Sequence, residues 1–100
     1  LVHGGGKEIS AMCAQLGIEA KFVQGLRVTD PETMRVTEMV MGQIGKNIAQ
    51  MLNEKGAPAV GLSGKDAELI TARKFVDEES DADWGLVGEA ETVNIGVLES

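Results

Sequence analysis

Aromatic residues are almost missing from this chain, which has two Phe, one Trp and no Tyr among its 100 residues. A platform of aromatic rings, on which single-stranded nucleic acids stack their bases, is therefore excluded. Basic residues are also scarce, because 9 Lys and Arg stand against 16 Asp and Glu and give a formal net charge of −7. Binding to nucleic acids through neutralised phosphates is disfavoured on this ground, and we expect no nucleic-acid partner.

Cysteine pairs, clusters of metal-binding residues and long apolar runs are absent as well. Cys13 is the one cysteine and His3 the one histidine, so neither an internal disulfide nor a metal site is expected. The uncharged stretches are too short to cross a bilayer, and the chain does not open with a basic segment followed by an apolar one. These features predict a cytoplasmic protein without a membrane partner.

The first predicted helix spans residues 7–16. Its apolar residues follow the spacing i, i+3, i+4, i+7, which places them on one face: Ile9, Met12, Cys13 and Leu16. Gly17 supplies the left-handed stop that commonly ends a helix. We expect Cys13 to be a small buried residue of this face and not a nucleophile.

The strongest predicted element is a long helix over residues 31–55. Thr29 and Glu32 have the spacing of a capping box at its start. One apolar stripe repeats every four residues: Val36, Val40, Ile44, Ile48 and Leu52. Methionines widen this apolar surface, so we expect one face to cover a sheet and another to meet a second subunit. Gly42 and Gly45 each weaken the helix, which indicates close approach of another backbone.

The remaining predicted elements are short and extended. Residues 1–3 resemble the end of a buried strand, and residues 57–66 a short buried strand that runs into a Gly/Ser turn. Residues 18–29 are expected to form a β-hairpin that turns at Gln24 and Gly25, or an extended bend. Residues 68–76 and 86–97 are expected to pair as a second hairpin, with the acidic segment 77–85 at its tip. Trp84 is expected to pack at the base of that hairpin. Strands that alternate with helices indicate an α/β fold.

Three consecutive glycines, Gly4, Gly5 and Gly6, lie between the first predicted strand and the first helix. In open α/β sheets ligands bind at such strand ends, and backbone amides at a helix start attract phosphate or carboxylate groups. The alternative is a tight strand-to-helix turn without a ligand. Two known phosphate-binding patterns do not fit: Glu8 stands where a Walker A loop after Gly6-Lys7 needs Ser or Thr, and Ile9 where the dinucleotide fingerprint needs Gly.

Three motifs in order resemble the acetylglutamate kinases of the amino acid kinase family: VHGGG at 2–6, GLRVTD at 25–30 and AVGLSGKD at 59–66. The resemblance extends over nearly all 100 residues and includes the long helix. It implies that residues 1–100 are part of a single amino acid kinase domain. The implied architecture is a three-layer α/β/α sandwich, of which this chain is part of the N-terminal, substrate-binding half, with a protruding β-hairpin.

The same resemblance implies phosphorylation of the γ-carboxylate of N-acetyl-L-glutamate by ATP, with Mg²⁺ accompanying the nucleotide, in arginine biosynthesis. It assigns Gly5 and Gly6 to backbone contacts with the substrate, places Gly4 and Gly5 beside the transferred phosphoryl group, and implies a homodimer built around the helix over residues 31–55. Arg27 matches the arginine that binds the substrate α-carboxylate, and its planar fork suits that partner. From the residues alone, a solvated strand arginine is the other interpretation.

The resemblance also implies flanking segments on both sides, which carry two lysines and an aspartate of the catalytic machinery. We therefore expect no catalytic residue within these 100 residues and no phosphoryl transfer by them alone. Two alternatives stay open: another carboxylate or carbamate kinase of the same superfamily, and a noncatalytic dimerisation or binding module that uses the methionine-rich helix. Spacing assigns no role to the turn formed by Ser63, Lys65 and Asp66.

Overall fold

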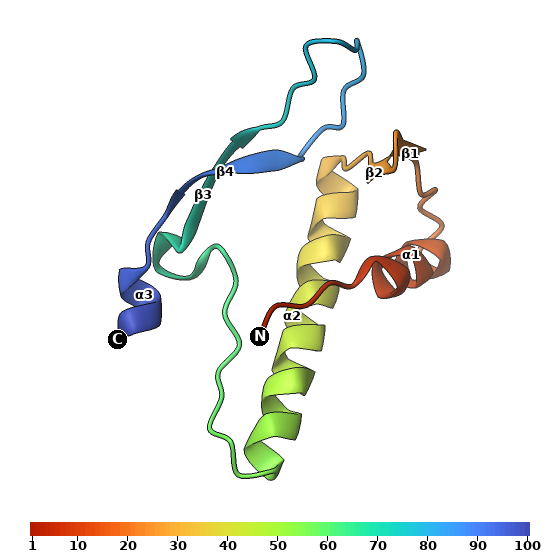
Figure 1. The fold of residues 1–100 in the computed structure, drawn as a ribbon. Coiled ribbons are helices and arrows are strands. Elements are labelled where there is room, and N and C mark those ends of the chain that lie inside the picture. The colour runs from red at the N-terminus through yellow and green to blue at the C-terminus, as the bar shows by residue number, and fades with distance from the viewer. The chain divides into compact units, whose positions relative to one another are not determined.

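A computed structural model describes residues 1–100, which form helices, short strands and two small sheets (Figure 1). The chain divides into two compact units. The first unit contains residues 1–20 and 31–61, and the second contains residues 21–30 and 62–100. None of the helices combines the length and the hydropathy that a membrane span requires.

The first unit is built from two helices, α1 (Gly6–Gln15) and α2 (Pro31–Glu54). Their apolar faces meet in one buried cluster: Ile9, Cys13, Val36 and Val40. Gly17, with φ of +72°, ends α1, and the amide of Ile18 returns to the carbonyl of Cys13 at 2.8 Å. Both helices therefore form where the apolar period predicts them, and Cys13 is fully buried as expected.

The start of α2 differs from the predicted capping box. The Thr29 hydroxyl donates to the carbonyl of Arg27 at 3.4 Å, and the Thr29 amide donates to the carbonyl of Trp84 at 2.8 Å. Because the Thr29 amide is bonded to Trp84, it does not donate to the Glu32 side chain, and because α2 begins at Pro31, Asp30 and not Thr29 precedes the helix. The capping-box prediction was wrong because the Thr29 amide is bonded to the carbonyl of Trp84, a residue far away in the sequence.

The second unit contains two antiparallel pairs of strands. Strands β1 (Phe22–Val23) and β2 (Leu26–Arg27) are joined by Gln24 and Gly25, whose φ values of +53° and +80° are typical of a type I′ hairpin turn. Strands β3 (Ile70–Lys74) and β4 (Gly88–Val93) also pair, with an irregularity between Thr71 and Ala72. The unit further contains a 3₁₀ turn, η1 (Asp66–Glu68), and a terminal helix, α3 (Gly96–Glu99).

Some extended segments do not form the strands that were predicted. Residues 1–3 and 57–62 have no ladder partner in the structure, and Leu1 and Val2 are each 97% exposed. A buried strand needs a neighbouring strand to satisfy its backbone, so an apolar pattern alone is insufficient. The predicted strand over residues 86–97 is also too long, because β4 ends at Val93 and α3 follows.

Candidate functional site

The glycine segment leads directly into α1. Gly5 is the residue before the helix, with an extended φ of −172°, and its carbonyl accepts the amide of Ile9 at 2.9 Å. The N-terminal amides of a helix point away from its first turn and carry the positive end of the helix dipole. The helix predicted after the glycines is confirmed, whereas the strand predicted before them is not formed. This geometry can receive a carboxylate or a phosphate group.

The three glycines have different surroundings. A Cβ atom on Gly5 would lie 2.7 Å from Ile44 Cδ1 and 2.9 Å from Met41 Sδ, so the missing side chain lets this backbone pack on α2. A Cβ atom on Gly4 or Gly6 would meet no heavy atom within 4 Å. The middle glycine thus has a packing role that the sequence did not reveal, while the space beside its two neighbours is open.

Gly45 shows why a glycine lies in the middle of α2. A Cβ atom there would lie 3.2 Å from His3 Nε2, and a Cβ atom on Gly61 would lie 3.4 Å from the Gly45 carbonyl carbon and oxygen. Close approach of another backbone was predicted for Gly42 and Gly45, and it is confirmed at Gly45. Gly42 has open space around it, so its role is not explained by packing in the structure.

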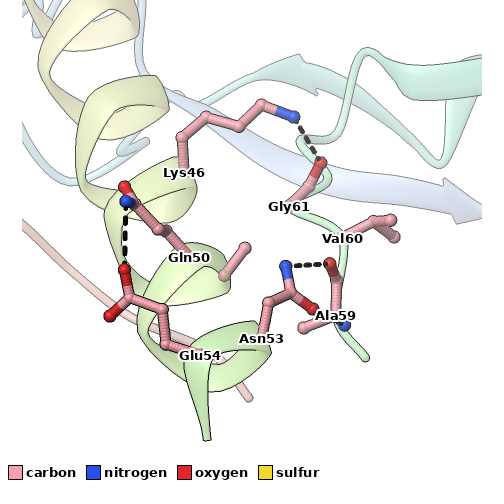
Figure 2. A pocket seen from close by; sticks show the side chains of 8 residues that line it. Lys46, Gln50, Asn53, Glu54, Ala59, Val60 and Gly61 are labelled. Carbon is pink, nitrogen blue, oxygen red and sulfur yellow. Dashed lines mark hydrogen bonds between the residues drawn. The ribbon is translucent and has the colours of Figure 1, made fainter. Parts of the chain in front are cut away.

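Polar side chains of α2 hold the extended segment that follows the helix. Asn53 Nδ2 donates to the carbonyl of Ala59 at 3.1 Å, the bond drawn in Figure 2. Asn53 Oδ1 accepts the backbone N–H of Ala59 at 2.7 Å. Lys46 Nζ donates to the carbonyl of Gly61 at 3.4 Å. Asn53 therefore satisfies both backbone groups of Ala59, as a neighbouring strand would do.

A shallow pocket lies between this segment and α2 (Figure 2), lined by Lys46, Ala49, Gln50, Asn53, Glu54, Ala59, Val60 and Gly61. None of the residues predicted to bind substrate lines it. Its polar groups bond one another or the backbone, including Gln50 Nε2, which donates to Glu54 Oε1 at 3.2 Å. The pocket is thus a junction between a helix and an extended segment, and we assign it no ligand.

Arg27 lies on β2, opposite Phe22 of β1. Its side chain is half-buried, and the guanidinium carbon is 4.8 Å from the centroid of the Phe22 ring. This distance is typical of a cation–π interaction, which restrains the long side chain. Arg27 is therefore packed against a ring and is not the fully solvated strand arginine of the other interpretation.

The predicted site residues are distributed over both units. Gly4, Gly5 and Gly6 belong to the first unit and Arg27 belongs to the second. The glycine amides and the guanidinium are therefore described separately, each within its own unit.

The hairpin that carries Arg27 is anchored by a residue from a distant part of the chain. Trp84 is 1% exposed, and its indole N–H donates to the carbonyl of Val23 in β1 at 2.9 Å. The Phe75 and Trp84 rings meet edge-on, with centroids 5.2 Å apart. Trp84 is buried as expected, but its partner strand is 61 residues earlier in the chain.

Two other turns are ordered locally. Asp66 Oδ2 accepts the amide of Ser63 at 2.7 Å, which closes the turn of the SGKD motif. Asp83 Oδ1 accepts the amide of Gly85 at 2.8 Å and lies 3.2 Å from Lys74 Nζ. The Gly85 hydrogen bond and the nearby ammonium group lower the pKa of Asp83 below its ordinary value.

Comparisons with known proteins extend over the entire chain. The family model described as "Amino acid kinase family" matches residues 1–100. An acetylglutamate kinase of Moorella thermoacetica is 49% identical over 107 residues, which cover 100% of this chain and 36% of that protein. One of Caldanaerobacter subterraneus subsp. tengcongensis is 53% identical over 100 residues, covering 99% of this chain and 32% of that protein.

A solved structure has a similar fold. A protein of Streptococcus mutans UA159 superimposes with a TM-score of 0.81 at 26% sequence identity, covering 97% of this chain and 38% of that one. The chain spans about a third of the length of the curated relatives it matches. The comparisons therefore concern one part of proteins that are about three times as long.

Proposed function

The chain belongs to the amino acid kinase family, and from this premise we propose that the protein that carries it is an acetylglutamate kinase. The reaction is transfer of the γ-phosphoryl group of ATP to the γ-carboxylate of N-acetyl-L-glutamate, a step of arginine biosynthesis. The observation that carries the proposal is about 50% identity, over the whole chain, to curated acetylglutamate kinases. The alternative of a noncatalytic module loses support for the same reason.

In the proposed site, the Arg27 guanidinium binds the α-carboxylate of the substrate. The charge and the planar fork of the guanidinium suit a carboxylate, and the Phe22 ring restrains it. Backbone amides at Gly5 and Gly6 bind the substrate at the start of α1, and Gly4 and Gly5 lie beside the transferred phosphoryl group. The open space beside Gly4 and Gly6 supports this assignment, since a ligand can approach the backbone there.

The chemistry proposed for this chain is positioning. Phosphoryl transfer has a loose transition state whose charge must be stabilised and whose reacting oxygens must be aligned. The glycine amides can hold an oxygen of the acceptor or of the phosphoryl group, while Arg27 fixes the far end of the acceptor. Mg²⁺ enters the proposal as part of the MgATP substrate.

Further parts of the proposal concern the whole protein. It is a cytoplasmic homodimer, with a contact through α2, where Met39 is 62% exposed and Met51 is 59% exposed. Its domain is a three-layer α/β/α sandwich from which the β3–β4 hairpin protrudes, and residues 1–100 belong to the acyl-amino-acid-binding half. Residues outside this chain supply the catalytic lysines, so these 100 residues do not transfer phosphate alone.

The test is an assay of the whole protein with MgATP and hydroxylamine, which converts an acyl phosphate into a stable hydroxamate. We expect hydroxamate and ADP to form with N-acetyl-L-glutamate and not with unacetylated glutamate. Carbamate, assayed by ADP release, addresses the other kinases of the superfamily. ADP formation with carbamate but not with N-acetyl-L-glutamate would contradict the proposal.

A further inference from the structure

The single tryptophan is bonded to the hairpin that carries Arg27. A buried indole N–H needs a hydrogen-bond partner, and here the partner is the carbonyl of Val23, 2.9 Å away. Val23 directly follows Phe22, whose ring lies under the guanidinium of Arg27. The indole thus fixes the strand that supports the arginine side chain.

A second set of bonds fixes the chain just after β2, the other strand of the same hairpin. The Thr29 amide donates to the carbonyl of Trp84 at 2.8 Å, and the Leu86 amide donates to the carbonyl of Thr29 at 2.7 Å. Thr29 and Gly85 form an isolated parallel bridge. Since Thr29 is two residues after Arg27, the chain is held on both sides of the arginine.

Gly85 is required for this close contact. Its φ is +72°, and a Cβ atom there would overlap the carbonyl oxygen of Thr29. Asp83 Oδ1 accepts the Gly85 amide and holds the turn that precedes the contact. Asp83 and Gly85 therefore hold Trp84 in place. Its indole bonds to Val23 in β1, and its backbone carbonyl bonds to Thr29, just after β2.

From these contacts we infer that Trp84 is a positioning residue for substrate binding: its indole holds the β1–β2 hairpin so that the Arg27 guanidinium is aligned before the acyl amino acid arrives. The inference rests on the proposed function, since it gives Trp84 a role at the same carboxylate. Preorganisation of this kind strengthens binding because less side-chain freedom is lost when the ligand binds. Trp84 does not touch the substrate in this account.

The test measures the dissociation constants of N-acetyl-L-glutamate and of ATP with the whole protein by calorimetry at 25 °C. Trp84→Phe keeps an aromatic ring and removes the N–H donor, so we expect acetylglutamate binding to weaken ~5-fold, as for one lost hydrogen bond. The affinity for ATP should stay at the wild-type value. Phe75→Leu is the matched control, because it removes the neighbouring ring and leaves the indole donor, and it should leave acetylglutamate affinity unchanged.

A double-mutant cycle separates positioning from general destabilisation. If Trp84 acts through Arg27, Trp84→Phe should cause no further loss of acetylglutamate affinity in an Arg27→Ala background. An equal loss in both backgrounds, or wild-type affinity in Trp84→Phe alone, would overturn the inference. Should Trp84→Phe fold poorly, Trp84→benzothienylalanine decides the matter, because it keeps the shape of the indole and lacks the donor.

The same titration distinguishes the two proposals. If the wild type binds acetylglutamate and Arg27→Ala weakens that binding while Trp84→Phe does not, the inference is wrong and the proposed function stands. If the wild type does not bind acetylglutamate, the proposed function is wrong and the role of Trp84 is contradicted with it.

Discussion

The Cα atom of Gly5 packs against the end of the Ile44 side chain, so closely that a methyl group on Gly5 would lie 2.7 Å from Ile44 Cδ1. Gly5→Ala in the whole protein should therefore lower the free energy of unfolding by about 1 kcal/mol, because the ends of Ile44 and Met41 must shift. Gly4→Ala is the control, since open space surrounds that position. Chemical unfolding measures both, and equal stability of the two variants would contradict the packing role.

The turn η1 contains two residues other than glycine with a left-handed backbone, Ala67 at φ +49° and Glu68 at φ +53°. This conformation costs an L-residue about 1–2 kcal/mol, and the gain from glycine is partly offset by its greater freedom in the unfolded chain. We expect Ala67→Gly to raise the free energy of unfolding by about 0.5–1 kcal/mol.

Ala72→Gly provides a control of opposite sign for that prediction. Ala72 lies within β3, where glycine weakens a strand, so this variant should be less stable than the wild type. The two midpoints of chemical unfolding should move in opposite directions. Destabilisation by Ala67→Gly would show that the positive φ of Ala67 is not strained in the protein.

The lowered pKa of Asp83 predicts that the stability of the protein depends on pH in acidic solution. The Gly85 amide and the Lys74 ammonium group lower the pKa of Asp83 below its ordinary value of 3.8. A carboxylate whose pKa is lower in the folded state stabilises the protein above its unfolded pKa, and that stability is lost as pH falls through its folded pKa. At pH 6 the wild type should thus have a higher melting temperature than Asp83→Asn. The difference between the two melting temperatures should become smaller below about pH 4.

The effect at Asp83 is expected to be small, because the carboxylate is exposed and solvent screens its interaction with Lys74. Asp81→Asn makes the same change of charge in the same segment and serves as the control. Calorimetric melting temperatures at several pH values measure both variants. A gap for Asp83→Asn that stays constant down to pH 2 would mean that its hydrogen bonds do not favour the charged form.

The exposed methionines of α2 test the proposed dimer. Val36 and Val40 are buried against α1, so substitutions there would damage the core and say nothing of a subunit contact. Met39→Glu and Met51→Glu place a charge on exposed parts of the helix. If α2 is the contact, at least one variant should sediment with the monomer mass where the wild type sediments as a dimer, because a buried unpaired charge is costly.

Gln43→Glu is the control for the dimer test, because it adds the same charge at an exposed polar position of α2. It should keep the wild-type mass. Wild-type mass in both methionine variants would exclude these residues from the subunit contact.

The helices could be predicted from the sequence because their signals are local. In α1 and α2 the apolar period agrees with a glycine of positive φ just after each helix, Gly17 and Gly56, so a short window of sequence suffices. The Gln24–Gly25 turn is equally local, and the hairpin that carries Arg27 forms where the turn predicts it.

Contacts between distant segments could not be predicted. The apolar pattern of residues 1–3 and 57–62 is the same whether or not a neighbouring strand is present, so it predicted strands that the structure does not contain. The bond from Trp84 to Val23 joins residues 61 positions apart, and nothing near either residue specifies the other. A lone tryptophan in a polar segment indicates a buried anchor, but not what it holds.

The central claim is that Arg27 binds the carboxylate of the acyl amino acid, and calorimetric titration of the whole protein with N-acetyl-L-glutamate tests it most directly. Arg27→Ala should weaken binding about tenfold or more, as expected for the loss of charged hydrogen bonds. Arg73→Ala removes an exposed arginine that pairs with Glu89 at 3.2 Å, and it should bind like the wild type. Equal affinity of Arg27→Ala and the wild type would contradict the account.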